Sequence, residues 1–208
     1  MKHLILAAAT ALAIATAPAN ISAAQPDHAA IAAQAKTSSY TDLLKKFKDG
    51  KQLTEAEATT LYYGSALQPG FTPDKDYTPV IAAYNSGDMK RAYNLANEAL
   101  ASDPTNLALL FKAYAAASAS ADPNIKAQAP AFQTRLLAIC DAIMNSGSGV
   151  ADASPYQVIR RSDINEFLVK YMQPKNVVGQ SQIGQLTAIK ASFDGIPDDV
   201  ILYFGIFK

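Results

Sequence analysis

The sequence has little of the chemistry on which most catalytic and metal sites depend. Its 208 residues include one cysteine, two histidines and no tryptophan. A single cysteine cannot form an intramolecular disulfide, so stability must come from core burial. Only His28 lies beyond the first 24 residues, which argues against a Ser-His-Asp triad, a Cys-His pair and a multi-histidine zinc site. We therefore expect no metal and no cofactor.

The sequence also lacks an excess of either charge and a long apolar run. Lys plus Arg and Asp plus Glu each number 18. Binding to nucleic acid and electrostatic docking on a membrane surface both need clustered positive charge, so neither partner is expected. The uncharged stretch over residues 4–17 is shorter than the ~20 apolar residues of a membrane-spanning helix. We expect no membrane anchor.

The first 24 residues show the features of a cleavable signal peptide in their usual order. Lys2 provides a positive start, residues 4–17 form the uncharged core, and Ser22-Ala23-Ala24 supplies the small residues that a signal peptidase reads. We therefore expect residues 1–24 to be removed and the protein to be exported, to a periplasmic or extracellular location.

The rest of the chain begins with a lead-in and a helical region. Residues 25–37 are Ala-rich without a face of large apolar residues, which predicts a flexible lead-in. Apolar residues then recur at helical spacing over 38–146, with a capping box at Thr54 and Glu57 and a further helix start at Asp103-Pro104. Cys140 falls within one apolar stripe, which predicts a buried, unreactive thiol.

The pattern changes after Gly149, and residues 147–208 are expected to form a small α+β region packed on the helices. Alternating and β-branched residues predict strands, and an apolar stripe predicts one helix that covers them. The expected class is α+β, with helical hairpins followed by a small antiparallel sheet. The expected strands are 156–160, 183–193 and 200–207, and the covering helix is 163–172.

Two resemblances follow from local motifs. Gly87-Asp88-Met89 with Ala92, Ala96, Ala99 and Pro104 resembles the second half of a tetratricopeptide repeat, which implies closely packed antiparallel helices. Residues 53–64, the run Asn145–Gly149 and the terminal Leu202–Ile206 resemble a family of secreted bacterial proteins catalogued as the domain of unknown function "forty-nine nineteen". This resemblance spans about residues 40–208 and implies export and fold without any assigned activity.

Tetratricopeptide-like packing would place the first helix of each pair along a concave face. That arrangement predicts a binding surface on which aromatic and polar side chains could take a segment of a partner. The candidate residues are Tyr77, Ile81, Tyr84, Asn85 and Phe111.

The function expected from these features is a non-enzymatic, extracytoplasmic interaction module whose partner is a protein or peptide. The alternative is a carboxylate-dependent envelope hydrolase acting on glycan or peptide, because glycoside hydrolysis needs only two carboxylates. Its candidate residues are Glu55, Glu57, Asp163 and Glu166, each of which also fits the first turn of a helix.

The signal-peptide interpretation predicts that the mature protein begins at Gln25. Intact-mass measurement of the protein recovered from the extracytoplasmic fraction tests this directly. A mass that retains residues 1–24, or recovery of the protein from the cytosol alone, would contradict the prediction of export.

Overall fold

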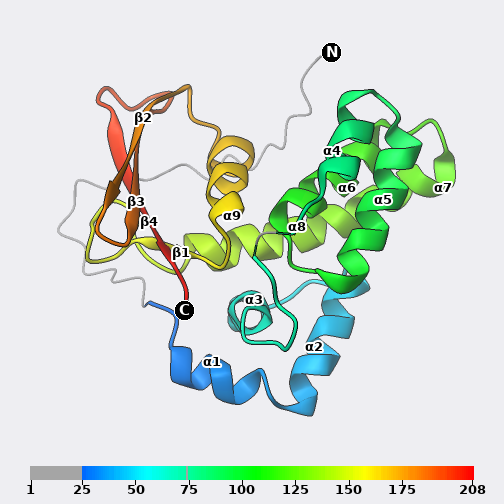
Figure 1. Ribbon diagram of the computed structural model, residues 1–208, viewed down its shortest axis with the longest axis horizontal. Coiled ribbons are helices and arrows are strands. Elements are labelled where there is room, and N and C mark those ends of the chain that lie inside the picture. Colours follow the sequence, from blue (N-terminus) through cyan, green and yellow to red (C-terminus); the bar gives the residue numbers. More distant parts are fainter. Residues whose placement is uncertain (1–24, 74) are drawn as a thin grey trace.

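The structure is a computed structural model that describes residues 25–73 and 75–208. The expected signal peptide lies outside the described residues. In the described chain, helices come first, from His28 to Met144, and the strands of a sheet lie between Tyr156 and Ile206 (Figure 1), so the α+β class is confirmed. The helices before the sheet are α1 (His28–Gln34), α2 (Ser38–Lys48), α3 (Glu55–Ser65), α4 (Thr78–Asn85), α5 (Met89–Ser102), α6 (Leu107–Ala119), α7 (Pro123–Lys126) and α8 (Ala129–Met144).

Local capping sets several of these boundaries. At the start of α3, the Glu57 backbone N–H donates to Thr54 Oγ1 and the Thr54 backbone N–H donates to the Glu57 carboxylate, which is the predicted capping box. Helix α6 begins later than expected, because its cap is Asn106 rather than Asp103: Asn106 Oδ1 accepts the backbone N–H of Leu109. The side chain of Asp103 is used elsewhere, as described below.

The prediction of a flexible lead-in over 25–37 is wrong, because the structure has helix α1 there. Asp27 caps this helix, and Ile31 is buried in the main core. The side chain of Gln25 donates hydrogen bonds to the carbonyl oxygens of Ser146 and Pro155. Ile31 and Ala35 are the buried residues of this segment, and these two are too few to give an apolar stripe in the sequence.

The sheet is mixed rather than wholly antiparallel. Its strands are β1 (Tyr156–Val158), β2 (Asn176–Ile183), β3 (Leu186–Ser192) and β4 (Val200–Ile206), in the order β1-β4-β3-β2. Strand β1 pairs with β4 in parallel, and the other pairs are antiparallel. The expected strand over 183–193 corresponds mainly to β3, which follows a turn at Gly184-Gln185; Gly184 has a φ of 59°. Strand β2 was not predicted, because its Asn, Gln and Ser residues give no apolar alternation.

The expected covering helix begins as α9 (Arg161–Glu166) and continues as a π-helical segment, η1 (Phe167–Met172). The ring of Phe167 contacts the rings of Tyr156 in β1 and Phe204 in β4. This segment therefore packs on the sheet and joins it to the helices.

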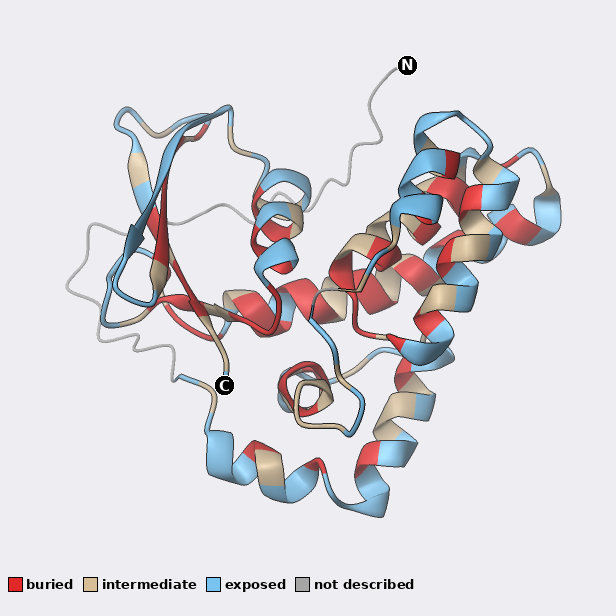
Figure 2. Ribbon diagram, in the orientation of Figure 1, coloured by how far each residue is buried: buried red, intermediate tan, exposed pale blue. Residues whose placement is uncertain are grey.

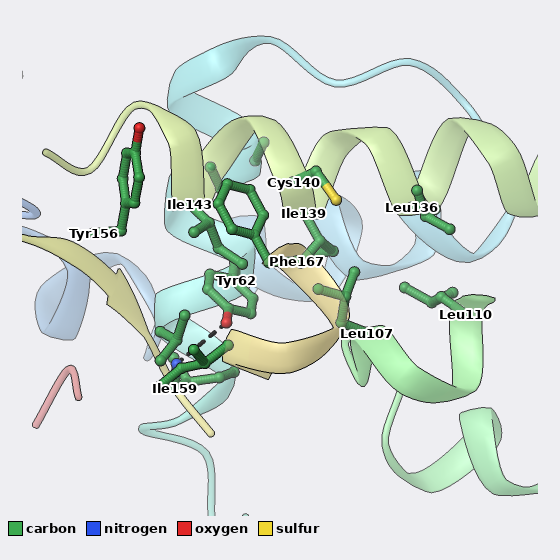
Figure 3. Packing of buried hydrophobic residues seen from close by; sticks show 14 of the residues in the cluster. Tyr62, Leu107, Leu110, Leu136, Ile139, Cys140, Ile143, Tyr156, Ile159 and Phe167 are labelled. Atoms are coloured by element: carbon green, nitrogen blue, oxygen red, sulfur yellow. Dashed lines mark hydrogen bonds between the residues drawn. The ribbon is translucent and has the colours of Figure 1, made fainter. Parts of the chain in front are cut away.

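One hydrophobic cluster includes both the helices and the sheet. Buried residues concentrate along α8 and on the inward sides of its neighbours (Figure 2). Tyr62, Ile143 and Phe167 lie together in this cluster, and the Ile159 backbone N–H donates to the Tyr62 hydroxyl at 3.2 Å (Figure 3). Cys140 is fully buried, as predicted, and burial raises the pKa of its thiol well above the usual value.

A tight junction connects α8 to β1. Ser146 Oγ donates to the carbonyl of Ile143 and accepts from the backbone N–H of Gln157, at 2.6 and 2.7 Å. The backbone of Gly147 lies so close to Pro155 that a Cβ at this position would collide with the Pro155 carbonyl. The end of α8 is therefore held directly against the start of the sheet.

We expect Gly147→Ala to lower the free energy of unfolding by about 1–3 kcal/mol, because the backbone of the junction must move to admit a methyl group. Urea unfolding followed by circular dichroism measures the change. Gly179→Ala is the matched control, since a Cβ there meets no atom within 4 Å, and its effect should stay within about 0.5 kcal/mol. Equal effects of the two substitutions would contradict the close packing at Gly147.

Candidate functional site

A groove lies between α4 and α6 on one side and α9 with η1 on the other. It consists of two hollows that adjoin at Lys112, which lines both. The first hollow has a volume of about 530 Å³ and includes residues of α4, α6 and α9. The second has a volume of about 440 Å³ and includes residues of α4, α6 and η1. We call the two together the helix groove.

The structure brings the five predicted binding residues to this groove but divides them between its hollows. The first hollow is lined by Tyr77, Ile81 and Asn85, and the second by Tyr84 and Phe111. Ile81 is 47% exposed, which suits contact with an apolar group. The opposite wall, formed by α9 and η1, was not foreseen. Its residues lie about 80 positions after those of α4, and no local sequence pattern predicts a contact between segments so far apart in the chain.

Sequence reasoning missed the lysines of the groove. Lys112 Nζ lies 5.0 Å from the centre of the Tyr84 ring, and Lys170 lies on the opposite wall of the second hollow. No Asp or Glu occurs among the described residues that line the second hollow. This hollow therefore combines aromatic rings with positive charge.

The first hollow carries charges of both signs. Asp76 and Glu166 line it together with Lys75 and Lys112. The Asp76 carboxylate accepts a hydrogen bond from the Thr78 backbone N–H, and its bonds with Thr78 lower the pKa of Asp76. Glu166 Oε2 is buried without a hydrogen-bond partner among the described residues.

Asp103 fixes the starts of the two helices that form one wall of the groove. Its carboxylate accepts hydrogen bonds from the Tyr77 hydroxyl, immediately before α4, and from Asn106 Nδ2, immediately before α6, each at 2.9 Å. Partial burial, with the nearby Asp103 charge, raises the pKa of Tyr77. The Tyr77 hydroxyl is thus engaged with Asp103, and its ring is the part that the groove can use.

Asp103 also pairs with Arg160, which lies between β1 and α9. The Arg160 side chain is almost fully buried, and its Nη1 lies 3.7 Å from a carboxylate oxygen of Asp163. The other contacts of this cluster are the Phe71 ring, 4.7 Å from the Arg160 guanidinium, and the Tyr62 hydroxyl, which donates to Asp163 at 2.7 Å. One cation thus lies between two buried carboxylates.

Burial raises the pKa of Asp163 to about 6, although the Arg160 charge and the Tyr62 hydrogen bond act in the opposite direction. The same burial, with the Asp163 charge nearby, raises the pKa of Tyr62 well above its usual value. Desolvation is costly for a carboxylate, and one shared cation offsets only part of that cost.

The four carboxylates considered for hydrolysis do not come together. Glu57 is tied to the Thr54 backbone and to Lys46 Nζ at 2.7 Å, and the hydrogen bond from Lys46 lowers its pKa. Glu55 also lies in the first turn of α3, while Asp163 is fully buried. Of the four, only Glu166 lines the helix groove.

Neither a metal site nor a membrane-spanning helix occurs within residues 25–73 and 75–208. They contain no group of three or more His, Cys, Asp or Glu side chains placed to hold a metal ion. In the same part of the chain, no helix has both the length and the apolar character to cross a membrane.

A family model described as a domain of unknown function, DUF4919, matches residues 27–206. The match includes α1 and every strand of the sheet, so the resemblance noted from local motifs is confirmed and extends further toward the N-terminus. No curated protein and no solved structure matches the chain. The tetratricopeptide-like packing of α4, α5 and α6 remains a prediction.

The raised pKa of Asp163 predicts a specific pH dependence of stability. The folded state binds this proton more tightly than the unfolded chain, whose aspartates titrate near 3.8. The contribution of Asp163 to stability is therefore fully present below about pH 4 and is lost as the pH rises through about 6. We expect the free energy of unfolding of the wild type to rise by about 1–3 kcal/mol relative to Asp163→Asn between pH 7 and pH 4.

Urea unfolding at several pH values measures this difference between the proteins. Asparagine keeps an acceptor for the Tyr62 hydroxyl and removes both the titration and the negative charge beside Arg160; the loss of that charge shifts the overall stability of the variant, so the comparison rests on the change with pH. Asp42→Asn, at an exposed position on α2, is the control and should follow the wild-type pH profile. If Asp163→Asn also follows that profile, the buried carboxyl does not titrate in this range.

Proposed function

The chain belongs to the DUF4919 family, a domain of unknown function, and we propose a function from the groove of the chain itself. The protein is a non-enzymatic, extracytoplasmic interaction module that binds an extended segment of a protein or peptide. The observation that carries this proposal is the second hollow of the helix groove, where aromatic rings and two lysines line one cavity. Export is supported by the order of features in residues 1–24.

The chemistry of the groove favours a segment that carries an apolar side chain beside a carboxylate. Tyr84, Phe111 and Tyr114 offer apolar surface, and Lys112 and Lys170 offer positive charge. Among the described residues, neither lysine forms an ion pair. A carboxylate bound between these lysines would gain two charge-assisted contacts next to an aromatic surface.

The groove also has a shape that suits an extended segment. The first hollow continues the second past Lys112, and it adds the exposed side chain of Ile81 and the amide of Asn85. An extended chain presents apolar and polar groups at alternating positions, which matches this succession of apolar and hydrogen-bonding surfaces. The mixed charges of Lys75, Asp76 and Glu166 would then select the residues that follow the anchored end.

The alternative, a carboxylate-dependent hydrolase, has less support. General acid catalysis requires a carboxyl group with a raised pKa within reach of the substrate. Asp163 has the raised pKa but is fully buried and bonded to Tyr62. In the groove itself, hydrogen bonding lowers the pKa of Asp76. An arrangement of this kind favours binding over acid catalysis.

A library of random decapeptides tests the proposed recognition. Selection on the purified protein should enrich sequences with Asp or Glu within two positions of an aromatic or aliphatic residue. Lys112→Gln should weaken binding of an enriched peptide by about 5- to 30-fold, measured by fluorescence anisotropy, because one charged contact of the anchor is lost.

Lys45→Gln is the matched control, since the Lys45 side chain is 75% exposed on α2, away from the groove. It should leave peptide binding unchanged, and both variants should keep the wild-type melting temperature. Enrichment without any acidic preference, or equal loss of affinity in the two variants, would refute the groove as the binding site.

A further inference from the structure

The two outer edges of the sheet differ in whether their outward-facing backbone groups have hydrogen-bond partners. At the β1 edge, the backbone of Gln157 is satisfied by side chains of neighbouring helices and loops. Its N–H donates to Ser146 Oγ at 2.7 Å, and its carbonyl accepts from the Tyr63 hydroxyl at 3.0 Å. Strand β1 has only three residues, so this edge offers no free ladder to another chain.

The β2 edge is open. All eight residues from Asn176 to Ile183 are exposed, and none of them carries a charge. The apolar members Val177, Val178 and Ile183 are 43%, 50% and 49% exposed. In the described chain, the backbone hydrogen bonds of this strand go to β3 on its inner side.

An edge strand of this kind is unusual in a folded protein. Exposed edges are commonly blocked by an inward charge, a proline or a bulge, because free N–H and C=O groups template the addition of another strand. Pro174 and Lys175 precede β2, and an irregularity lies between Val177 and Gly179. The regular stretch Gly179–Ile183 carries none of these devices.

From this asymmetry we propose that β2 pairs with β2 of a second copy of the chain, antiparallel across a two-fold axis, to form a continuous sheet through both copies. Each copy has one open edge and one sealed edge, so pairing stops at a dimer and does not propagate into a filament.

The residues of the strand favour a second copy over a different partner. An uncharged strand meets no like charge when it faces itself, and it offers no charge that would select another chain. The Gln180 amide can donate and accept, and the Gln182 amide, whose Nε2 donates to Thr187 Oγ1 at 2.8 Å, keeps its carbonyl oxygen and a second N–H, so the two amides can bond to one another across the axis. The interface is confined to one strand and its side chains, so the dimer should be weak, with a dissociation constant on the order of 10–100 µM.

Sedimentation velocity of the exported protein, from about 5 to about 500 µM, measures the dimer directly. We expect a reversible monomer–dimer equilibrium. Ile183→Lys should weaken the dimer at least about 10-fold, because it places a charge on the open edge. Ile201→Lys is the matched control: Ile201 is 44% exposed but lies on β4, an interior strand, and the dimer should persist.

A charge exchange separates pairing from any general effect on folding. Ser181 lies at the middle of Gly179–Ile183, so the two copies of this residue should be close to the axis. Ser181→Lys and Ser181→Glu should each be monomeric when alone, and an equimolar mixture should restore the dimer. A wild-type protein that remains monomeric at the highest concentration, a dimer that survives both single variants, or a mixture that stays monomeric would overturn the proposal.

Discussion

The buried carboxylate of Asp103 determines how the parts of this protein are arranged relative to one another. It accepts hydrogen bonds from the Tyr77 hydroxyl at the start of α4 and from the Asn106 amide at the start of α6. It also pairs with the Arg160 guanidinium, which follows β1 of the sheet. A buried charge is tolerated only when it is paired and hydrogen-bonded, and these three contacts meet that requirement together. Each partner comes from a different segment, so the requirement can be met in only one relative placement of those segments.

The helix groove follows from that placement. Its first wall consists of the two helices whose starts Asp103 holds. Its second wall consists of α9, which begins directly after Arg160, and of η1, which continues it. The polar cluster around Asp103 thus holds the starts of the helices of one wall, while the second hollow of the groove is lined by aromatic rings and lysines. The proposed binding surface would therefore be held in shape before a partner arrives, which lowers the entropic cost of association.

The sequence predicted the features that depend on neighbouring residues. The capping box at Thr54 and Glu57, the helical stripe around Cys140 and the terminal strand at Val200–Ile206 are all local, and all are present. The role of Asp103 could not be predicted, because an aspartate before a proline has the pattern of a helix cap and Arg160 lies 57 positions away. Strand β2 could not be predicted from the sequence, because it is a polar edge strand that pairs with β3 without burying any of its residues. The parallel pairing of β1 with β4 likewise depends on how distant segments meet.

The export proposed above has a consequence for Cys140 during biosynthesis. An oxidising compartment readily converts free thiols to mixed disulfides, and the accessible thiolate is the species that reacts. In the folded protein the Cys140 thiol is buried on α8 and its pKa is raised. The thiol is therefore neither accessible nor readily ionised, and oxidation requires both. Under the proposed export, the period in which this thiol can be oxidised would be confined to translocation and folding, before α8 packs. The rate at which α8 packs would then determine what fraction of molecules escapes oxidation, and the folded protein would keep its single free thiol without a reductant.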